Sequence, residues 1–484
     1  MNRPNIVLIM TDQQRADWTA AGGFPLDTMP FLDELMSGGV QFRRAHTTSP
    51  LCVPARISLL TGRYPSAHRV RQNSAAQHVL RGADLVDVLR ESGYALHLAG
   101  KTHFHREPGD FDTYAAPYWH VGGPQSTPEH KRFDEWLLAQ DHSVGHEATP
   151  FPLESQLPYR IVSDAIEAVD ATPDDRPFFS WLSFPEPHNP YQVPEPYFSM
   201  FDPDEVPERM VGPEGAERKG GTYVWLRRLI EEKRPGYDEE WRRYRANYCG
   251  MLRLIDDQVR RFFTHLHQSG RDADTLVFFV ADHGDFTGDY GLQRKGAGMP
   301  ECLMRIPFSV VGPGVRARTD DVDFVSLADL FPTICDALGV EIPAGVQGRS
   351  LWPLLTGEPY PAEEFATGYG ELGFGGLPYG VEERPPLHFP YEGRTFDELN
   401  TVTQSGTTVM VRRAQWKLML DESGNGELYD LDADPAELDN RYADPELAGI
   451  RAGLTTDLAR WMIRVRDDLP EAVYTLKRAP HNWR

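Results

Sequence analysis

Four short apolar segments constrain the fold of this chain more than any other feature. They are rich in β-branched and aromatic side chains, and they span residues 5–10, 94–99, 178–184 and 276–281. Each is apolar at successive positions, so neither face of such a strand is suited to water, as in parallel sheets covered on both sides. Amphipathic segments of helical length lie between them. The sequence therefore predicts an α/β fold with a mainly parallel sheet.

Helical patterns occupy much of the intervening sequence. The expected helices span residues 29–37, 85–92, 159–171, 239–268 and 328–338. Three of them stop immediately before a glycine, namely Gly38, Gly93 and Gly339. Because glycine adopts a left-handed conformation at no steric cost, these positions predict left-handed C-terminal caps.

The length of 484 residues exceeds what one hydrophobic core usually organises. Residues 184–236 are rich in proline, glycine and charge, which predicts an irregular surface excursion and not a second core. After a similar stretch at 351–401 come three short strand patterns and a helix, at residues 407–411, 416–420, 428–431 and 447–465. We expect a main domain over residues 1–360 and a small C-terminal α+β subdomain over residues 361–484.

Charge and cysteine usage limit the partners and the compartment. The chain has 49 Lys and Arg against 72 Asp and Glu, a net charge of -23, which opposes binding to nucleic acid or to anionic membrane. The four cysteines form no C-x-x-C pair, so neither a zinc ribbon nor a disulfide scaffold is indicated. No apolar run approaches the roughly 18 residues that span a bilayer, and the N-terminal run does not resemble a signal peptide. We expect a soluble, cytoplasmic protein without a membrane or nucleic-acid partner.

Polar residues capable of chemistry follow each of the four predicted strands. They are Asp12 and Gln13, then Lys101 and His103, then His188, and finally Asp282 and His283. Taken singly, each has an ordinary alternative as a turn aspartate, a solvated lysine or a loop histidine. Because ligands of open α/β sheets bind outside the carboxyl ends of the strands, their coincidence at four such ends predicts one shared polar site.

The residue types at two of these ends are suited to a divalent cation. Asp12 and Asp282 supply carboxylates, and Gln13 and His283 supply neutral donors. A ligand set dominated by oxygen favours calcium, magnesium or manganese. Zinc is less favoured, because the chain contains neither H-E-x-x-H nor paired cysteines.

A fifth feature is the segment from Ser49 to Arg63. Pro54 is suited to the first turn of a helix and Gly62 to its end, which predicts Cys52 at a helix N-terminus with Arg56 about one turn inside. Unpaired N–H groups and a nearby cation favour anions such as sulfate or phosphate there. The alternative is a small buried cysteine that only begins a short helix.

The run C-V-P-A-R at Cys52, followed by S-L-L-T-G-R, resembles the C-x-P-x-R signature of the type I, formylglycine-dependent sulfatases of the alkaline phosphatase superfamily. Further motifs occur in the order of that family, namely N-I-V-L-I-M-T-D, G-K-T-H, P-H-N-P, A-D-H-G-D and Q-R-K-G. The resemblance extends from residue 5 to about residue 440. It implies an alkaline phosphatase-like fold, a large mixed, mainly parallel sheet sandwiched by helices, whose main domain is the catalytic sulfatase domain.

The resemblance also implies a cofactor chemistry. Cys52 would be oxidised by a formylglycine-generating maturation enzyme to Cα-formylglycine, whose hydrate attacks the sulfur of a small-molecule sulfate ester. Asp12, Gln13, Cys52, Asp282 and His283 would hold one divalent cation. Calcium is expected there, with manganese as the alternative because Gln13 and His283 replace the acid and the asparagine of many animal sulfatases.

The remaining site residues take their expected roles from the same resemblance. Arg56 and Lys101 would hold the hydrate, His103 would accept a proton during elimination, His188 would protonate the leaving alcohol, and Lys295 and Asn73 would contact sulfate, together with Lys101 and His188. For Asn73 an ordinary polar loop residue is the alternative. Arg15, Arg305 and Glu371 are weaker candidates for the mouth of the site, with solvated side chains as the ordinary interpretation.

The sequence leaves two other functions open. The combination of Gln13 and His283 resembles that of choline sulfatases and of phosphonate monoester hydrolases. A phosphonate monoester or phosphodiester hydrolase is therefore the main alternative. Lys101 and His103 match the sulfatase pattern, which favours a sulfatase acting on a sulfated carbohydrate or another small ester. A relative that only binds sulfated ligands would not need Cys52. Nothing in the pattern specifies an oligomeric state.

Overall fold

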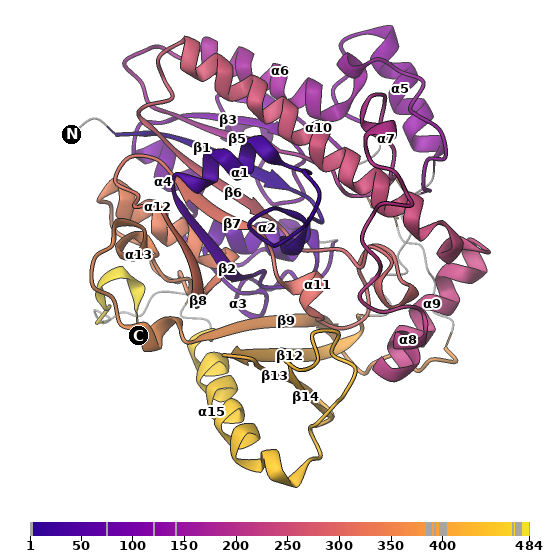
Figure 1. Cartoon of the computed structure of the whole chain (residues 1–484). Helices are drawn as coiled ribbons and strands as arrows, with labels where there is room; N and C mark the ends of the chain where they lie inside the picture. The colour runs from indigo at the N-terminus through magenta and orange to yellow at the C-terminus, as the bar shows by residue number, and fades with distance from the viewer. Residues whose placement is uncertain are drawn as a thin grey trace.

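The computed structural model describes residues 3–73, 76–119, 122–140, 143–383, 390–391, 394–395, 404–466, 469 and 477–483. The strands of the main body are β1 (Asn5–Thr11), β2 (Val40–His46), β3 (Ala95–Gly100), β4 (Thr113–Ala115), β5 (Phe178–Ser183), β6 (Thr275–Ala281), β7 (Phe308–Val311) and β8 (Arg318–Ser326). Within the described residues they form one eight-stranded sheet in the order β4-β3-β5-β1-β6-β7-β2-β8. Helices cover both of its faces (Figure 1).

The four strands predicted from the sequence lie next to one another in this sheet. β3, β5, β1 and β6 are consecutive and parallel, with Ile6 paired to Phe179 on one side and to Leu276 on the other. β7 is antiparallel to both of its neighbours, β6 and β2. The predicted α/β fold with a mixed, mainly parallel sheet is therefore confirmed, and the ends of the four strands meet at one edge.

Alternate residues of β1 enter two different cores. Ile6, Leu8 and Met10 belong to a core that includes α2 (Cys52–Thr61), α4 (Leu85–Glu91), α12 (Leu330–Leu338) and α13 (Trp352–Thr356). Val7 and Ile9 belong to a second core with α1 (Pro30–Ser37), α5 (Pro128–Ala139), α6 (Leu157–Asp170) and α10 (Trp241–Gln268). Burial of both faces explains why these strands have no polar alternation.

The predicted caps are correct in two of three cases. Gly93 and Gly339, after α4 and α12, have φ values of 84° and 66°. The left-handed cap expected at Gly38 is wrong, because Gly38 has a φ of -74°. It is the next residue that needs glycine here, since a Cβ at Gly39 would lie 2.0 Å from the Val310 carbonyl oxygen of β7.

The segment 184–236 is irregular over residues 184–196 and 201–213, as predicted, but the expectation that all of it is irregular is wrong. It contains α7 (Tyr197–Met200), α8 (Glu214–Lys219) and α9 (Gly221–Lys233). Apolar residues of α9, among them Leu226 and Ile230, form a third core with Phe286 and Tyr290 from the loop after β6. The prolines and glycines of this segment separate short helices, and the helical period inside α9 was hidden among its charged residues.

The C-terminal region is a four-stranded antiparallel sheet in the order β14-β13-β12-β9 with one long helix against it (Figure 1). Its elements are β9 (Thr367–Gly375), β12 (Gly406–Arg413), β13 (Trp416–Asp421), β14 (Gly426–Asp430) and α15 (Ala448–Arg464). Three strands and the helix match the predicted α+β subdomain. β9 was missed because its glycines weaken the strand pattern, although Gly373 is needed where a Cβ would lie 2.1 Å from the Gly406 carbonyl oxygen of β12. The division at residue 360 stays a prediction.

Smaller elements complete the described chain. They include α3 (Pro65–His68), α11 (Glu301–Met304) and a two-stranded pair, β10 (Pro390–Tyr391) and β11 (Arg394–Thr395). Among the helices of the described residues, none combines the length and apolar character needed to cross a bilayer.

Candidate active site

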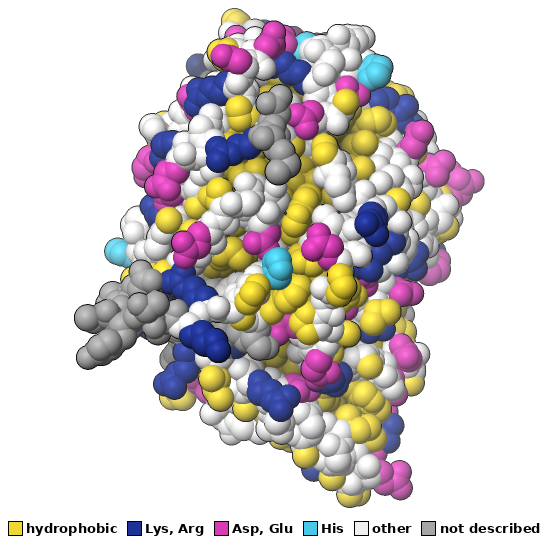
Figure 2. All heavy atoms as spheres, turned by 90° about the vertical axis from the view of Figure 1, so that its left-hand side faces the viewer, with side chains coloured by type: hydrophobic (Ala, Val, Ile, Leu, Met, Phe, Trp, Pro, Cys, Tyr) yellow, Lys and Arg dark blue, Asp and Glu magenta, His cyan; other side chains and the backbone are white. Residues whose placement is uncertain are grey.

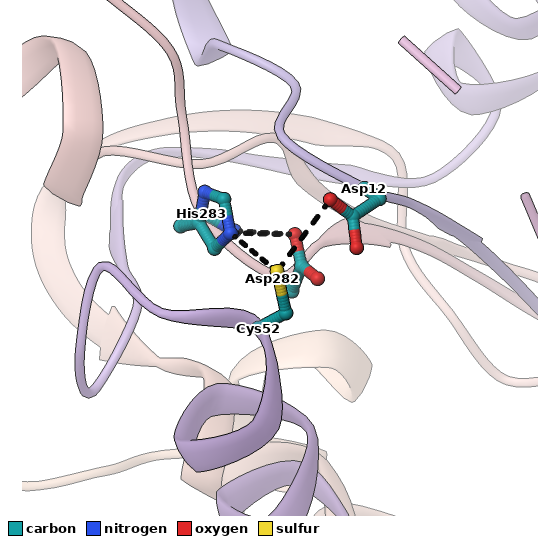
Figure 3. Close-up of side chains that lie close together, drawn as sticks. All are labelled: Asp12, Cys52, Asp282 and His283. Carbon is teal, nitrogen blue, oxygen red and sulfur yellow. Dashed lines mark hydrogen bonds and ion pairs between the residues drawn. The ribbon is translucent and has the colours of Figure 1, made fainter. Parts of the chain in front are cut away.

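Four side chains from different parts of the sequence converge at the edge where the parallel strands end (Figure 3). Asp12 follows β1, Asp282 and His283 follow β6, and Cys52 begins α2. One ligand atom from each of the four lies within 4.8 Å of the other three. Cys52 Sγ lies 3.2 Å from His283 Nε2 and 3.7 Å from Asp12 Oδ1. Two carboxylates, an imidazole and a thiol thus face one small space and fit a divalent cation.

Helix α2 places Cys52 as the sequence predicted. Leu51 is extended, Cys52 is the first helical residue, and Gly62 closes the helix with a φ of 62° and an N–H bond to the Ser58 carbonyl oxygen. Asn73 Oδ1 accepts a hydrogen bond from the Val53 N–H at 3.2 Å. Asn73 therefore satisfies one of the unpaired N–H groups of the helix and lies next to Cys52.

Two buried cations bind the outer oxygens of the carboxylates. Arg56 Nε donates to Asp282 Oδ2 at 2.9 Å, and Arg56 Nη2 donates to Asp12 Oδ2 at 3.2 Å. Lys101 Nζ lies 2.7 Å from the same Asp12 Oδ2. The Oδ1 atom of Asp12 faces Cys52, and that of Asp282 lies 3.7 Å from His283 Nε2. Each carboxylate thus keeps one oxygen toward the space that Cys52 and His283 share.

The electrostatics of the two carboxylates differ. Burial opposes ionisation of Asp12, but the charge of Lys101, followed by those of His188, Arg56 and Lys295, outweighs it and holds the pKa of Asp12 well below its usual range. Burial and then the charge of Asp12 raise the pKa of Asp282 to about 6. Burial lowers the pKa of His283, which favours the neutral imidazole that a metal ligand requires.

Gln13 and Lys295 lie beside this cluster and bind each other. Gln13 has a φ of 69°, and its N–H donates to Asp282 Oδ1 at 2.9 Å. Lys295 Nζ, which is buried, donates to Gln13 Oε1 at 2.8 Å. The structure therefore brings the lysine of Q-R-K-G to the cation cluster from a loop that precedes α11.

The two histidines expected to transfer protons come from the other two strand ends. His103, after β3, is buried, has a φ of 50°, and packs its ring against Trp119 with a centroid distance of 5.2 Å. His188, after β5, is half-buried, and its Nδ1 lies 2.9 Å from the Asn189 carbonyl oxygen. The contribution of His188 to the low pKa of Asp12 places its ring within electrostatic range of the cluster.

Sequence reasoning missed several polar residues of this region. Asp285 is the last residue of the motif A-D-H-G-D, so the sequence could have indicated it as a site residue. Glu186, in P-E-P-H-N-P, is buried, and its burial raises its pKa to about 8. Tyr191 and Tyr244 carry no sequence signal, because only the packing of α10 against the loop after β5 brings them to Asp285.

Two of the three weaker candidates for the mouth of the site, Arg15 and Glu371, are not solvated side chains. Arg15 is buried and ion-paired to Asp17 and Asp289, each at 2.6 Å. Glu371 is buried and accepts hydrogen bonds from Ser66 and Tyr369. Arg305 is half-buried and lines a cavity beside α1. The expectation of a solvated side chain is wrong for Arg15 and Glu371, because both belong to internal polar networks.

The other cysteines are structural. Cys249 and Cys335 are buried in the two large cores, as predicted, and Cys302 is buried in the third. None of the four cysteines forms a disulfide.

Comparison with known proteins agrees with this geometry. The family model described as Sulfatase matches residues 4–340. The multifunctional alkaline phosphatase superfamily protein PehA of Trinickia caryophylli is 28% identical, with 96% of each chain covered, and the arylsulfatase of Clostridium perfringens is 27% identical, with 90% of each covered. The solved phosphonate monoester hydrolase of Agrobacterium radiobacter superposes with a TM-score of 0.79 at 26% identity over 97% of both chains. With its alkaline phosphatase-like fold, the chain belongs to the sulfatase family of sulfuric ester hydrolases.

Proposed function

We propose that this enzyme hydrolyses a small sulfate monoester, such as a sulfated carbohydrate, to the alcohol and inorganic sulfate at Cys52. The observation that carries the proposal is the convergence of Cys52 Sγ, Asp12 and His283 within 3.7 Å at the start of a helix. Such a helix start favours an anion.

Buried cations strengthen the case for an anionic substrate. Arg56, Lys101 and Lys295 are all buried at this edge, in a chain whose net charge is -23. On the face that Figure 2 shows, acidic and basic side chains are interspersed. The positive charge at the site is therefore local, which suits a small sulfate ester better than a long sulfated polymer.

The nucleophile in this proposal is Cα-formylglycine made from Cys52 by a maturation enzyme that reads C-V-P-A-R. Its hydrate supplies two hydroxyl groups on one carbon, one to attack sulfur and one to release sulfate. Asp12, Gln13, Cys52, Asp282 and His283 would hold one divalent cation, which stabilises negative charge on the substrate when bound. The oxygen ligands favour calcium, and the imidazole of His283 makes manganese the alternative.

The roles proposed for the chain's own residues are those that the family resemblance implies, and the contacts of Arg56, Lys101 and Asn73 support them. Arg56 fixes both carboxylates through separate nitrogens, and Lys101 neutralises Asp12. The Oδ1 of Asn73 accepts a hydrogen bond from the Val53 N–H of α2, so the amide nitrogen of Asn73 can donate to a sulfate oxygen. Lys295 would donate to a second sulfate oxygen. His188 donates a proton to the oxygen that leaves sulfur, and His103 accepts the proton released when sulfate departs.

A phosphonate monoester or phosphodiester hydrolase with the same nucleophile is the second candidate. The TM-score of 0.79 to a phosphonate monoester hydrolase favours it. Lys101 and His103, which match the sulfatase pattern, favour sulfate. The two candidates share every step at Cys52 and differ in the charge and shape of the transferred group.

A direct comparison of two substrates decides between them. We would measure kcat/KM for 4-nitrophenyl sulfate and for 4-nitrophenyl phenylphosphonate with one preparation, and with Cys52→Ala as the background. A larger value for the sulfate supports the proposal. A larger value for the phosphonate replaces it with the second candidate, and no hydrolysis of either ester contradicts both.

A further inference from the structure

A second buried carboxylate, Asp285, lies directly behind Gln13. Its Oδ2 accepts hydrogen bonds from Gln13 Nε2 at 2.6 Å and from the Tyr191 hydroxyl at 3.0 Å. Its Oδ1 accepts one from the Thr287 N–H at 2.6 Å and one from the Tyr244 hydroxyl. All four partners are donors, so Asp285 acts only as an acceptor in this arrangement.

The contacts of Gln13 with Asp285 and Lys295 determine the orientation of its amide. Asp285 can only accept from the amide, and Lys295 can only donate to it. Turning the amide over would place its oxygen against the carboxylate of Asp285 and its NH₂ group against the ammonium of Lys295. The two neighbours therefore enforce one orientation, with the NH₂ group toward Asp285 and the oxygen away from it.

We propose that Asp285 is a positioning residue that holds the Gln13 carbonyl oxygen in its ligand orientation and requires an amide, not a carboxylate, at position 13. The inference rests on the proposed cation site, since it concerns the donor that Gln13 would offer there. It also excludes glutamate at this position, because a carboxylate in place of the Gln13 amide would meet Asp285 at 2.6 Å in a buried site. Two like charges at that separation cannot both stay ionised cheaply.

The structure predicts how Asp285→Asn acts. The Thr287 N–H is a fixed backbone donor, so the new amide must place its oxygen there and turn its NH₂ group toward Gln13. Two NH₂ groups then face each other, and the Gln13 amide loses its preferred orientation. With Gln13→Glu in the same chain, that NH₂ group would instead donate to the new carboxylate, which Lys295 also binds.

The test is a double-mutant cycle on chelator-treated protein, with Asp285→Asn, Gln13→Glu and the double variant. The readouts are Mn²⁺ affinity by isothermal titration calorimetry and the thermal unfolding temperature without metal. We expect each single variant to bind Mn²⁺ about 10- to 100-fold more weakly, the usual effect of removing a partner of a metal ligand. We expect the double variant to bind more tightly and to unfold at a higher temperature than either single variant.

Tyr244→Phe is the matched control. It removes one donor to Asp285 but leaves the bond between Asp285 and Gln13 intact. It should lower the unfolding temperature and leave Mn²⁺ affinity within about twofold, well inside the range expected for loss of a ligand partner. An equal loss of Mn²⁺ affinity in Tyr244→Phe would show that Asp285 acts only through general packing and would overturn the inference.

The remaining outcomes are also decisive. Wild-type Mn²⁺ affinity in Asp285→Asn, or strictly additive effects in the double variant, overturns the inference. If Asp285→Asn does not fold, a folded double variant that binds Mn²⁺ supports it, and an unfolded one overturns it. None of these readouts depends on turnover. If the wild-type enzyme hydrolyses neither ester, the proposed function is rejected, but the positioning role of Asp285 is not.

Discussion

The protein has two buried clusters of charged side chains, one at Cys52 and one between the two sheets. They differ in which partners surround their carboxylates. In the second cluster, Lys417 of β13 lies 3.1 Å from both Glu301 and Glu437. Glu301 also pairs with Arg412 of β12 and lies 3.3 Å from His46 of β2. Its members join the C-terminal sheet to α11 and to the main sheet through pairs of opposite charge.

The cluster at Cys52 has the same ingredients in a different arrangement. Arg56 and Lys101 bind the outer oxygens of Asp12 and Asp282, and the inner oxygens point toward the thiol and the imidazole (Figure 3). Between the sheets, burial opposes the charge of Glu301, but Arg412 and then Lys417 hold its pKa well below its usual range. Buried charge alone thus indicates structure, whereas donor atoms that converge on one space indicate binding and chemistry.

The largest expected effect is at the nucleophile. Cys52→Ala should abolish turnover of every sulfate ester, because no other side chain at this edge replaces the group that attacks sulfur. The fold should persist, since one short side chain at a helix start contributes little to the core. Turnover of 4-nitrophenyl sulfate and the thermal unfolding temperature measure the two effects, and residual activity above one-thousandth of wild type would contradict the assignment.

Removal of the cation should come next. Strong chelation should remove activity, and Asp12→Asn or Asp282→Asn should do so more completely than Gln13→Ala, because a charged oxygen ligand is harder to replace than a neutral one. The measurement is kcat/KM for an aryl sulfate with and without added Ca²⁺ or Mn²⁺. Equal losses in the three variants would contradict the ranking.

The effect at His188 should depend on the leaving group. If His188 protonates the departing oxygen, His188→Ala should slow esters of sugar alcohols by about 10²- to 10⁴-fold more than esters of nitrophenol, which leaves without a proton. The comparison uses kcat/KM of both substrate classes in both proteins. A uniform loss would assign His188 to sulfate binding and move the acid to His103 or Lys295.

Substitutions in the cluster between the sheets should lower the free energy of unfolding and leave kcat unchanged. Lys417→Met leaves two buried carboxylates without their shared cation, which costs about 3–5 kcal/mol of unfolding free energy. Denaturant titration measures that loss, and kcat on an aryl sulfate below the unfolding transition should stay near wild type. Lys131→Met, which breaks an exposed pair with Glu135, is the control, at about 0–1 kcal/mol. A large loss of kcat in folded Lys417→Met would contradict the claim that this cluster acts only on stability.

Much of this arrangement could be predicted from local sequence pattern. The strands before Asp12, Lys101 and Asp282 are buried on both faces and mostly apolar, and the start and end of α2 are marked by Pro54 and Gly62. These signals lie within a few residues of the feature that they predict.

The features that could not be predicted depend on contacts far apart in the chain. The bond from Lys295 to Gln13 spans 282 positions, and the Tyr244 hydroxyl reaches Asp285 only because α10 packs across the sheet. In β9 one glycine is required by a distant strand, since a Cβ at Gly373 would lie 2.1 Å from the Gly406 carbonyl oxygen of β12. The apolar residues of α9 are buried against the loop that follows β6. This contact cannot be predicted from the local sequence of either segment.

The state of residue 52 decides whether this site works as a formylglycine hydrolase. The measurement is mass spectrometry of the peptide that contains Cys52, made from a preparation whose turnover of an aryl sulfate is determined in parallel. We predict the mass of the aldehyde or its hydrate, with a fraction that rises in proportion to kcat across preparations made with and without a maturation enzyme. Full activity in a preparation whose residue 52 is entirely unmodified thiol would contradict the mechanism.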